Sequence, residues 1–146
     1  MTDGVEMSGA LDGIRVLDLS TLVQGPQAAA MLHDLGAEVL KIELPEIGDM
    51  GRHVGIVEEL GTSVFWEACN RGKRSVTLDL RTEAGKEAFL KLVEISDVVL
   101  SNFQPGTLEG WGLGYEDLAA INPGVIWAAG SFLGPTGPDA LREGAD

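Results

Sequence analysis

Residues 11–43 read LDGIRVLDLSTLVQGPQAAAMLHDLGAEVLKIE. The apolar run at residues 14–19 is typical of a buried strand. A second run, at residues 39–42, follows an alanine-rich segment with helical spacing. Strand, helix and strand in this order predict a βαβ unit. Because open parallel sheets bind ligands at the carboxyl ends of their strands, we expect a binding site at the loop after the first strand.

The predicted helix of this unit has recognisable ends. Pro26 stands just inside its start, where a missing N–H costs nothing, and Gly36 stands just past its end, where a left-handed residue is favourable. Apolar residues at helical spacing predict the face that packs on the sheet, namely Ala28, Met31, Leu32 and Leu35. His33 falls off this face, so we interpret it as an exposed helix histidine and not as a catalytic group.

The rest of the chain continues the alternation of strands and helices. Strands are predicted at residues 75–80, 98–100 and 125–129, and helices at 63–70, 82–94 and 115–121. Residues 44–62 are rich in glycine and are predicted to be a long irregular loop, a type that is usually functional or mobile. The pattern predicts an α/β fold that is Rossmann-like, with a mostly parallel sheet and helices on both faces.

The composition excludes several functions. The chain has 146 residues and a net charge of −13, which is unfavourable for nucleic-acid binding because phosphate contacts supply most of that affinity. No apolar run is long enough to span a membrane, and residues 1–10 resemble a loose leader and not a signal peptide. The single cysteine, Cys69, excludes an internal disulfide and indicates a reducing, cytoplasmic location. The two histidines and this cysteine have no metal-ligand spacing.

The residues expected at the carboxyl edge suit a nucleotide-like ligand with phosphates. They comprise a helix N-terminus, the cation Arg81 and several amide side chains, without a catalytic triad or a glycine-rich phosphate motif. For each loop alone, ordinary turn formation is the alternative interpretation. The cluster Arg71, Lys73 and Arg74 precedes a strand and should lie at the opposite edge, as a solvated or ion-paired turn. The three tryptophans are interpreted as packing anchors, namely Trp66, Trp111 and Trp127.

Several ordered segments resemble those of the family III CoA-transferases, which include formyl-CoA transferase, carnitine CoA-transferase and the α-methylacyl-CoA racemases. They are LDGIRVLDLS, GP, DLGAEVLKIE, NRGKRSVTLDLRTEAGK, SDVVLSNFQPGTLEGWGLGYEDL and INPGVIWAAGSFLGPTGP. The resemblance implies a Rossmann-like large domain, a small domain and two subunits interlocked as rings. It implies that this chain is the front part of a longer large domain. Residues 11–130 would be its CoA-binding part, and the Gly/Pro-rich residues 131–146 would lead to an absent remainder. A native tail is the alternative interpretation.

The resemblance also implies the chemistry. Family members move CoA between an acyl-CoA and a carboxylic acid, through an aspartate that forms a covalent aspartyl-CoA intermediate, and hold no permanent cofactor. That aspartate is expected beyond Asp146, which matches a different family aspartate. The chain alone should therefore bind part of CoA without transferring it, and the longer protein should form a homodimer.

CoA contacts carried over from the family fall on the predicted edge. They are Val23, Gln24, Leu78, Asp79, Leu80, Arg81, Asn102, Phe103 and Gln104, with Arg81 in place of a family lysine. Many members carry an arginine where this chain has Leu44, and some carry another where it has Gly110. Losing these two cations should weaken binding or shift the phosphates toward Arg81.

Two other functions remain open. One is an α-methylacyl-CoA racemase-like enzyme, which Ala145 disfavours because racemase members have a histidine at that position. The other is a non-catalytic subunit that binds CoA or a nucleotide and completes a heteromer.

Overall fold

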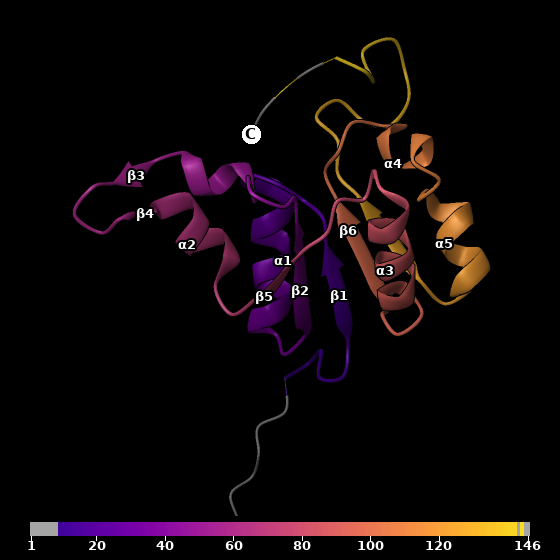
Figure 1. The fold of residues 1–146 in the computed structure, drawn as a ribbon, viewed down its shortest axis with the longest axis horizontal. Coiled ribbons are helices and arrows are strands. Elements are labelled where there is room, and N and C mark those ends of the chain that lie inside the picture. The colour runs from indigo at the N-terminus through magenta and orange to yellow at the C-terminus, as the bar shows by residue number, and fades with distance from the viewer. Residues whose placement is uncertain (1–8, 143, 145–146) are drawn as a thin grey trace, which may run out of the picture.

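The computed structural model describes residues 9–142 and 144 of the chain. Their centre is a five-stranded, wholly parallel sheet in the order β5-β2-β1-β6-β7 (Figure 1). The strands are β1 (Arg15–Asp18), β2 (Glu38–Glu43), β5 (Arg74–Thr77), β6 (Val98–Ser101) and β7 (Ile126–Ala129). The chain winds outward from β1 in both directions, which is the doubly wound order. The predicted α/β class with a parallel sheet is confirmed.

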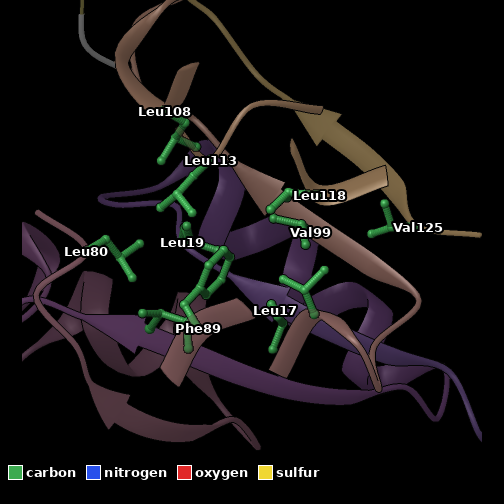
Figure 2. Close-up of a cluster of buried hydrophobic side chains, with 11 residues drawn as sticks. Leu17, Leu19, Leu80, Phe89, Val99, Leu108, Leu113, Leu118 and Val125 are labelled. Carbon is green, nitrogen blue, oxygen red and sulfur yellow. The ribbon is translucent and has the colours of Figure 1, made fainter. Parts of the chain in front are cut away.

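Helices cover both faces of the sheet, as predicted. The helices are α1 (Gln24–Asp34), α2 (Val64–Asn70), α3 (Glu83–Val93), α4 (Thr107–Gly110) and α5 (Tyr115–Ile121). Successive strand residues point to opposite faces, so Val16 packs under α1 with Ala29, while Leu17 faces α3 and contacts the cluster around Phe89. Figure 2 shows this second, larger cluster, in which Leu118 of α5 joins Val99 of β6. Parallel strands buried on both faces explain the continuous apolar runs in the sequence.

The packing face predicted for α1 is wrong. Ala28 is exposed, Met31 and Leu35 are 56% and 50% exposed, and Leu32 is only partly buried. The helix instead places its small residues against the sheet, which are Gly25, Pro26, Ala29 and Ala30. Small side chains let the helix approach the sheet closely. A search for large apolar residues at helical spacing therefore does not identify its contact face.

The ends of α1 agree better with the sequence. Gly36 has φ +106°, as expected for the left-handed residue after a helix. The helix begins at Gln24, so Pro26 is its third residue and not its first.

Residues 44–62, predicted to be irregular, contain short elements. They are the 3-10 turn η1 (Met50–His53) and the strand β3 (Ile56–Val57), which pairs antiparallel with β4 (Thr62–Ser63). Figure 1 shows the β3–β4 hairpin projecting with α2 on the β5 side of the sheet, away from α4 and α5.

Other boundaries are close to the predictions. Thr82 caps α3 by accepting the Gly85 N–H, and α5 has the predicted bounds. The short α4 was not predicted. After Ala129, residues 130–142 and 144 form no helix or strand, and the leader assigned to residues 1–10 lies mainly outside the described residues. No helix in the described part of the chain is long and apolar enough to cross a membrane.

Candidate functional site

A cavity of about 330 Å³ lies at the carboxyl edge of the sheet. It is formed where the segments after β1, β2 and β5 meet, and residues 47–50 fold over it from the long connection after β2. Most of its wall is apolar, with Leu19, Ile42 and Leu44 among the lining residues. Such a cavity, with a few polar groups at its margin, is typical of a small-molecule site.

The structure brings five of the nine predicted contact residues into the wall of this cavity, namely Leu78, Asp79, Leu80, Arg81 and Phe103. Val23 and Gln24 do not line it but stand at the start of α1, and the Gln24 side chain is close to Gly130 after β7. Asn102 follows β6 and lies behind the loop after β1. Gln104 is exposed, with its backbone carbonyl accepting the Thr107 N–H. All nine belong to the predicted edge.

Arg81 does not offer a free cation to this site. Its Nε and a terminal nitrogen donate to the two carboxylate oxygens of Asp79, each over 2.8 Å. These bonds and the Arg81 backbone N–H lower the pKa of Asp79 to about 2. A ligand phosphate would therefore compete with Asp79 for the guanidinium, an arrangement that the sequence pattern did not indicate.

The loop after β1 is held by side chains from other segments. Asn102 accepts the Thr21 N–H and donates to the Thr21 carbonyl, each over 2.8 Å. The Leu22 N–H donates to Asp49 Oδ1 over 3.0 Å. Gly25 allows α1 to start against this loop, because a Cβ at that position would lie 2.2 Å from Cβ of Ser20. The loop is thereby fixed at the mouth of the cavity.

A cluster of buried charged side chains lies next to the loop after β1, and the sequence patterns did not predict it. Lys41 and Asp49 are each 1% exposed and Asp18 is fully buried. Lys41 Nζ lies 2.6 Å from Asp49 Oδ2 and 3.6 Å from Asp18 Oδ2, while Lys73 Nζ donates to Asp18 Oδ2 over 2.7 Å. The two carboxylates and two ammonium groups balance, as a buried cluster requires. A visible signal was available, since Asp18 and Lys41 interrupt apolar strands that should be buried on both faces.

Glu43 joins the end of β2 to the segment that covers the cavity. Its carboxylate accepts two bonds from Arg52, over 2.7 and 2.8 Å, one from the Ser75 hydroxyl and one from the Asp49 N–H. Burial opposes ionisation of Glu43, but the bonds from Arg52 and Ser75 outweigh it and lower its pKa to about 2. Arg52 lies over the Trp66 ring, 3.4 Å from its centroid, which fixes the guanidinium further.

Two members of the basic cluster around the start of β5 are ion-paired outside the cavity, as predicted. Arg71 pairs with Asp34 and Arg74 pairs with Glu38. Lys73 differs from the expected solvated turn, because its side chain is 1% exposed and reaches Asp18 under α1. The cluster thus anchors α1 and β2 and adds nothing to the cavity.

The remaining residues singled out in the sequence have mainly packing roles. Trp66 stacks on Arg52 and Trp127 packs against the larger core cluster. Trp111 packs edge-on against Phe103 with ring centroids 5.8 Å apart, and it also lines the cavity. Cys69 is buried, and burial raises the pKa of its thiol, as expected for an unreactive cysteine. His33, which the sequence predicts to be exposed, is instead partly buried, with Nδ1 3.2 Å from the Ala37 carbonyl oxygen.

Comparison with known proteins agrees with this geometry. The sequence profile of CoA-transferase family III matches residues 11–146. Succinyl-CoA–D-citramalate CoA-transferase of Chloroflexus aurantiacus is 47% identical over 134 residues, covering 92% of this chain and 33% of that protein. The alpha subunit of succinyl-CoA–L-malate CoA-transferase of the same organism is 46% identical over 135 residues, with 92% and 32% covered.

Solved structures show the same fold. The crystal structure of Rv3272 from Mycobacterium tuberculosis superposes with a TM-score of 0.89 at 43% identity, covering 95% of this chain and 39% of that one. A CAIB/BAIF family protein from Brucella suis gives a TM-score of 0.87 at 45% identity, with 95% and 38% covered. The chain spans about a third of the length of the curated relatives it matches. The chain belongs to CoA-transferase family III.

Proposed function

We propose that the chain supplies the CoA-binding edge of an enzyme that moves CoA between carboxylic acids. The observation that carries the proposal is the cavity at the carboxyl edge, whose wall contains Leu78, Leu80, Arg81 and Phe103 in a chain of this family. The two Chloroflexus relatives named above are CoA-transferases named for succinyl-CoA with D-citramalate and with L-malate. Acyl-CoA and a carboxylic acid are therefore the proposed substrates, with CoA as substrate and not as a resident cofactor.

The finer mechanism follows the family resemblance. An aspartate attacks the acyl-CoA thioester and releases CoA as the thiolate. The thiolate then displaces the acyl group as its carboxylate and leaves an aspartyl-CoA thioester. The acceptor carboxylate attacks that thioester, which forms a mixed anhydride with the aspartate and again releases CoA as the thiolate. The thiolate attacks the acceptor's acyl carbon in this anhydride, which forms the new acyl-CoA and frees the aspartate. In longer members of the family this aspartate lies past the position of Asp146, so we propose that residues 11–130 form the CoA-binding front of a large domain.

The proposed location and assembly also follow from the resemblance. We propose a cytoplasmic protein whose longer form is an interlocked homodimer, without nucleic-acid or membrane partners. The composition supports the exclusion of nucleic acid, since acidic residues exceed basic ones by thirteen charges.

A heteromeric subunit is a second candidate function. It is favoured by one observation, that relatives more than 40% identical are the separate alpha and beta subunits of one CoA-transferase. In that case the chain would bind CoA and leave the chemistry to its partner. The racemase-like alternative has no comparable support, because Ala145 replaces the family's racemase histidine.

Calorimetry with CoA, combined with a CoA-exchange assay, tests the proposal. We expect the chain to bind CoA weakly and to transfer nothing between succinyl-CoA and malate. Adenosine diphosphate should compete with CoA, because it shares the nucleotide part of CoA. If it does not weaken CoA binding, the CoA site does not lie at the nucleotide-binding edge. Robust turnover by the chain alone would contradict the proposed position of the nucleophile.

A further inference from the structure

Buried side chains bond the backbone of the loop between β1 and α1. The Ser20 carbonyl accepts a bond from Lys41 Nζ. The Leu22 N–H donates to Asp49 Oδ1 over 3.0 Å, and the same oxygen accepts the Gly51 N–H over 2.7 Å. One ion pair, between Lys41 and Asp49, therefore reaches both ends of this short loop.

Leu22 has a backbone conformation that needs such support. Its φ is +66°, in the left-handed region that non-glycine residues rarely adopt. The bond from its N–H to the buried carboxylate of Asp49 is charge-assisted and therefore stronger than a neutral one. Because Leu22 directly precedes Val23, the residue before the first turn of α1, this bond also sets how the helix begins.

Stability alone does not explain this ion pair. Apolar residues of similar volume can replace a buried ion pair without loss of stability, and often with a gain. What they cannot replace are the bonds to the Ser20 carbonyl and the Leu22 N–H. The contribution that is particular to this pair is therefore its bonds to the backbone of the loop.

The position of the loop connects its shape to the ligand site. Ser20, Thr21, Lys41 and Asp49 all line the cavity, and the loop leads into the start of α1. A loop that is fixed before the ligand arrives loses little freedom on binding, which increases affinity.

We infer that Lys41 and Asp49 are positioning residues that hold Ser20–Leu22 and the first turn of α1 in the shape that binds CoA. The inference rests on the proposed function, because it takes CoA as the ligand of this edge. Neither residue needs to touch CoA or a reacting atom to act in this way.

Two double variants differ in whether residue 49 offers an acceptor to the Leu22 N–H and to the Gly51 N–H, which share the same oxygen. Both replace Lys41 by Met, so both lose the ion pair and the bond to Ser20, and Asp18 keeps Lys73 as its partner. Lys41→Met with Asp49→Asn retains a side-chain oxygen for the Leu22 N–H, whereas Lys41→Met with Asp49→Leu does not. Asp97→Ala is the matched control, since Asp97 accepts the Arg15 N–H over 2.8 Å at the opposite edge of the sheet.

Three measurements are made on each variant, namely urea unfolding, the hydrogen-exchange rate of the Leu22 amide and the Kd for CoA by calorimetry. We expect both double variants to fold, and the Asp49→Leu form to bind CoA at least about tenfold more weakly than the Asp49→Asn form. Its Leu22 amide should exchange about tenfold faster or more. Asp97→Ala should change neither quantity.

Other outcomes separate the two claims. Equal CoA affinity in the two double variants would overturn the positioning role and leave the proposed function standing. If the unaltered chain does not bind CoA, the proposed function fails, and equal exchange of the Leu22 amide in both variants would then overturn the positioning role independently. If the Asp49→Leu form does not fold, the Asp49→Asn form is compared with the unaltered chain, because it lacks the ion pair and the bond to Ser20 and offers Leu22 only a neutral acceptor. Unchanged CoA affinity and unchanged exchange of the Leu22 amide would then overturn the positioning role.

Discussion

Asn102 bonds both backbone polar groups of Thr21, a residue 81 positions earlier in the chain. Its Oδ1 accepts the Thr21 N–H and its Nδ2 donates to the Thr21 carbonyl, each over 2.8 Å. The bonds join the end of β6 to the loop after β1, across the boundary between the two halves of the doubly wound sheet. In folds of this type the ligand lies at that boundary, so we expect Asn102 to shape the site even though it does not line the cavity.

Asn102→Ala should therefore impair both stability and binding. Loss of two partly buried hydrogen bonds should lower the free energy of unfolding by about 1–3 kcal/mol. It should also weaken CoA binding, because the Thr21 segment is no longer fixed. Urea unfolding and calorimetry with CoA measure the two effects.

Asn122→Ala is the control for this variant. Asn122 likewise bonds the backbone, donating to the carbonyls of Val93, at the end of α3, and Ser96, in the turn before β6. We expect a similar loss of stability with unchanged CoA affinity. Equal affinity in both alanine variants would remove Asn102 from the site.

Arg81 and Asp79 should have opposite effects on CoA binding. Arg81→Ala removes a cation and leaves the Asp79 carboxylate at the cavity, so the Kd should rise by about tenfold, as for one charge-assisted contact. Asp79→Ala frees the guanidinium from its bidentate partner, so the Kd should fall. Calorimetry at two salt concentrations checks both, since exposed charge effects weaken with added salt. A rise in Kd for both variants would contradict this prediction, because it would mean that CoA binding needs the intact ion pair.

Leu44→Arg should tighten CoA binding. Leu44 lines the cavity at a position where many family members carry an arginine. A cation there would attract the CoA phosphates, and the gain should decrease as salt is added. Leu44→Met is the control for a change in shape without charge. An arginine variant that binds no better than the methionine variant would place the phosphates elsewhere.

Gly110→Arg tests the second replaced cation. Gly110 has no atom within 4 Å of the position that a Cβ would take, so a side chain can start there without a clash. We expect unchanged stability and a smaller gain in CoA affinity than for Leu44→Arg, because the neighbouring Trp111, and not Gly110, lines the cavity. Unfolding and titration of the variant give both values.

Acid should destabilise the fold through Glu43. Its folded-state pKa is lowered from 4.5 to about 2, so its stabilising contribution is complete above pH 4.5 and is lost as the pH falls toward 2. The shift corresponds to an upper value of about 3 kcal/mol. Glu43→Gln should lower stability at pH 7 and flatten this part of the pH profile. A profile as steep as that of the unaltered chain would assign the acid sensitivity to other groups.

Much of the fold could be predicted because its strands are buried on both faces. Apolar runs such as the one through Val16 and Leu17 have that cause, and the order of strands and helices then gave the parallel sheet. The face of α1 could not be read in this way, since Ala29 and Ala30 contact the sheet while Met31 is exposed. The β3–β4 hairpin was missed because its strands are only two residues long.

The candidate site could be predicted only in part. Residues that follow strands, such as Arg81 a few positions after β5 and Asn102 directly after β6, lie at the carboxyl edge because a parallel sheet places them there. Asp49 and Met50 come to the cavity from a long connection, whose path depends on bonds to Glu43 and Leu22 that no local pattern encodes. The Asp79–Arg81 pair was visible as two nearby charges, but not its bidentate geometry.

An NMR titration of the isotope-labelled chain with CoA tests the central claim most directly. We predict that the largest amide shifts fall on the carboxyl edge, at Gln24, Arg81 and Asn102, and that residues of the opposite edge such as Arg15 and Ser96 do not respond. Shifts concentrated around Arg15 and Ser96, or no shifts at millimolar CoA, would contradict the assignment of this edge to coenzyme A.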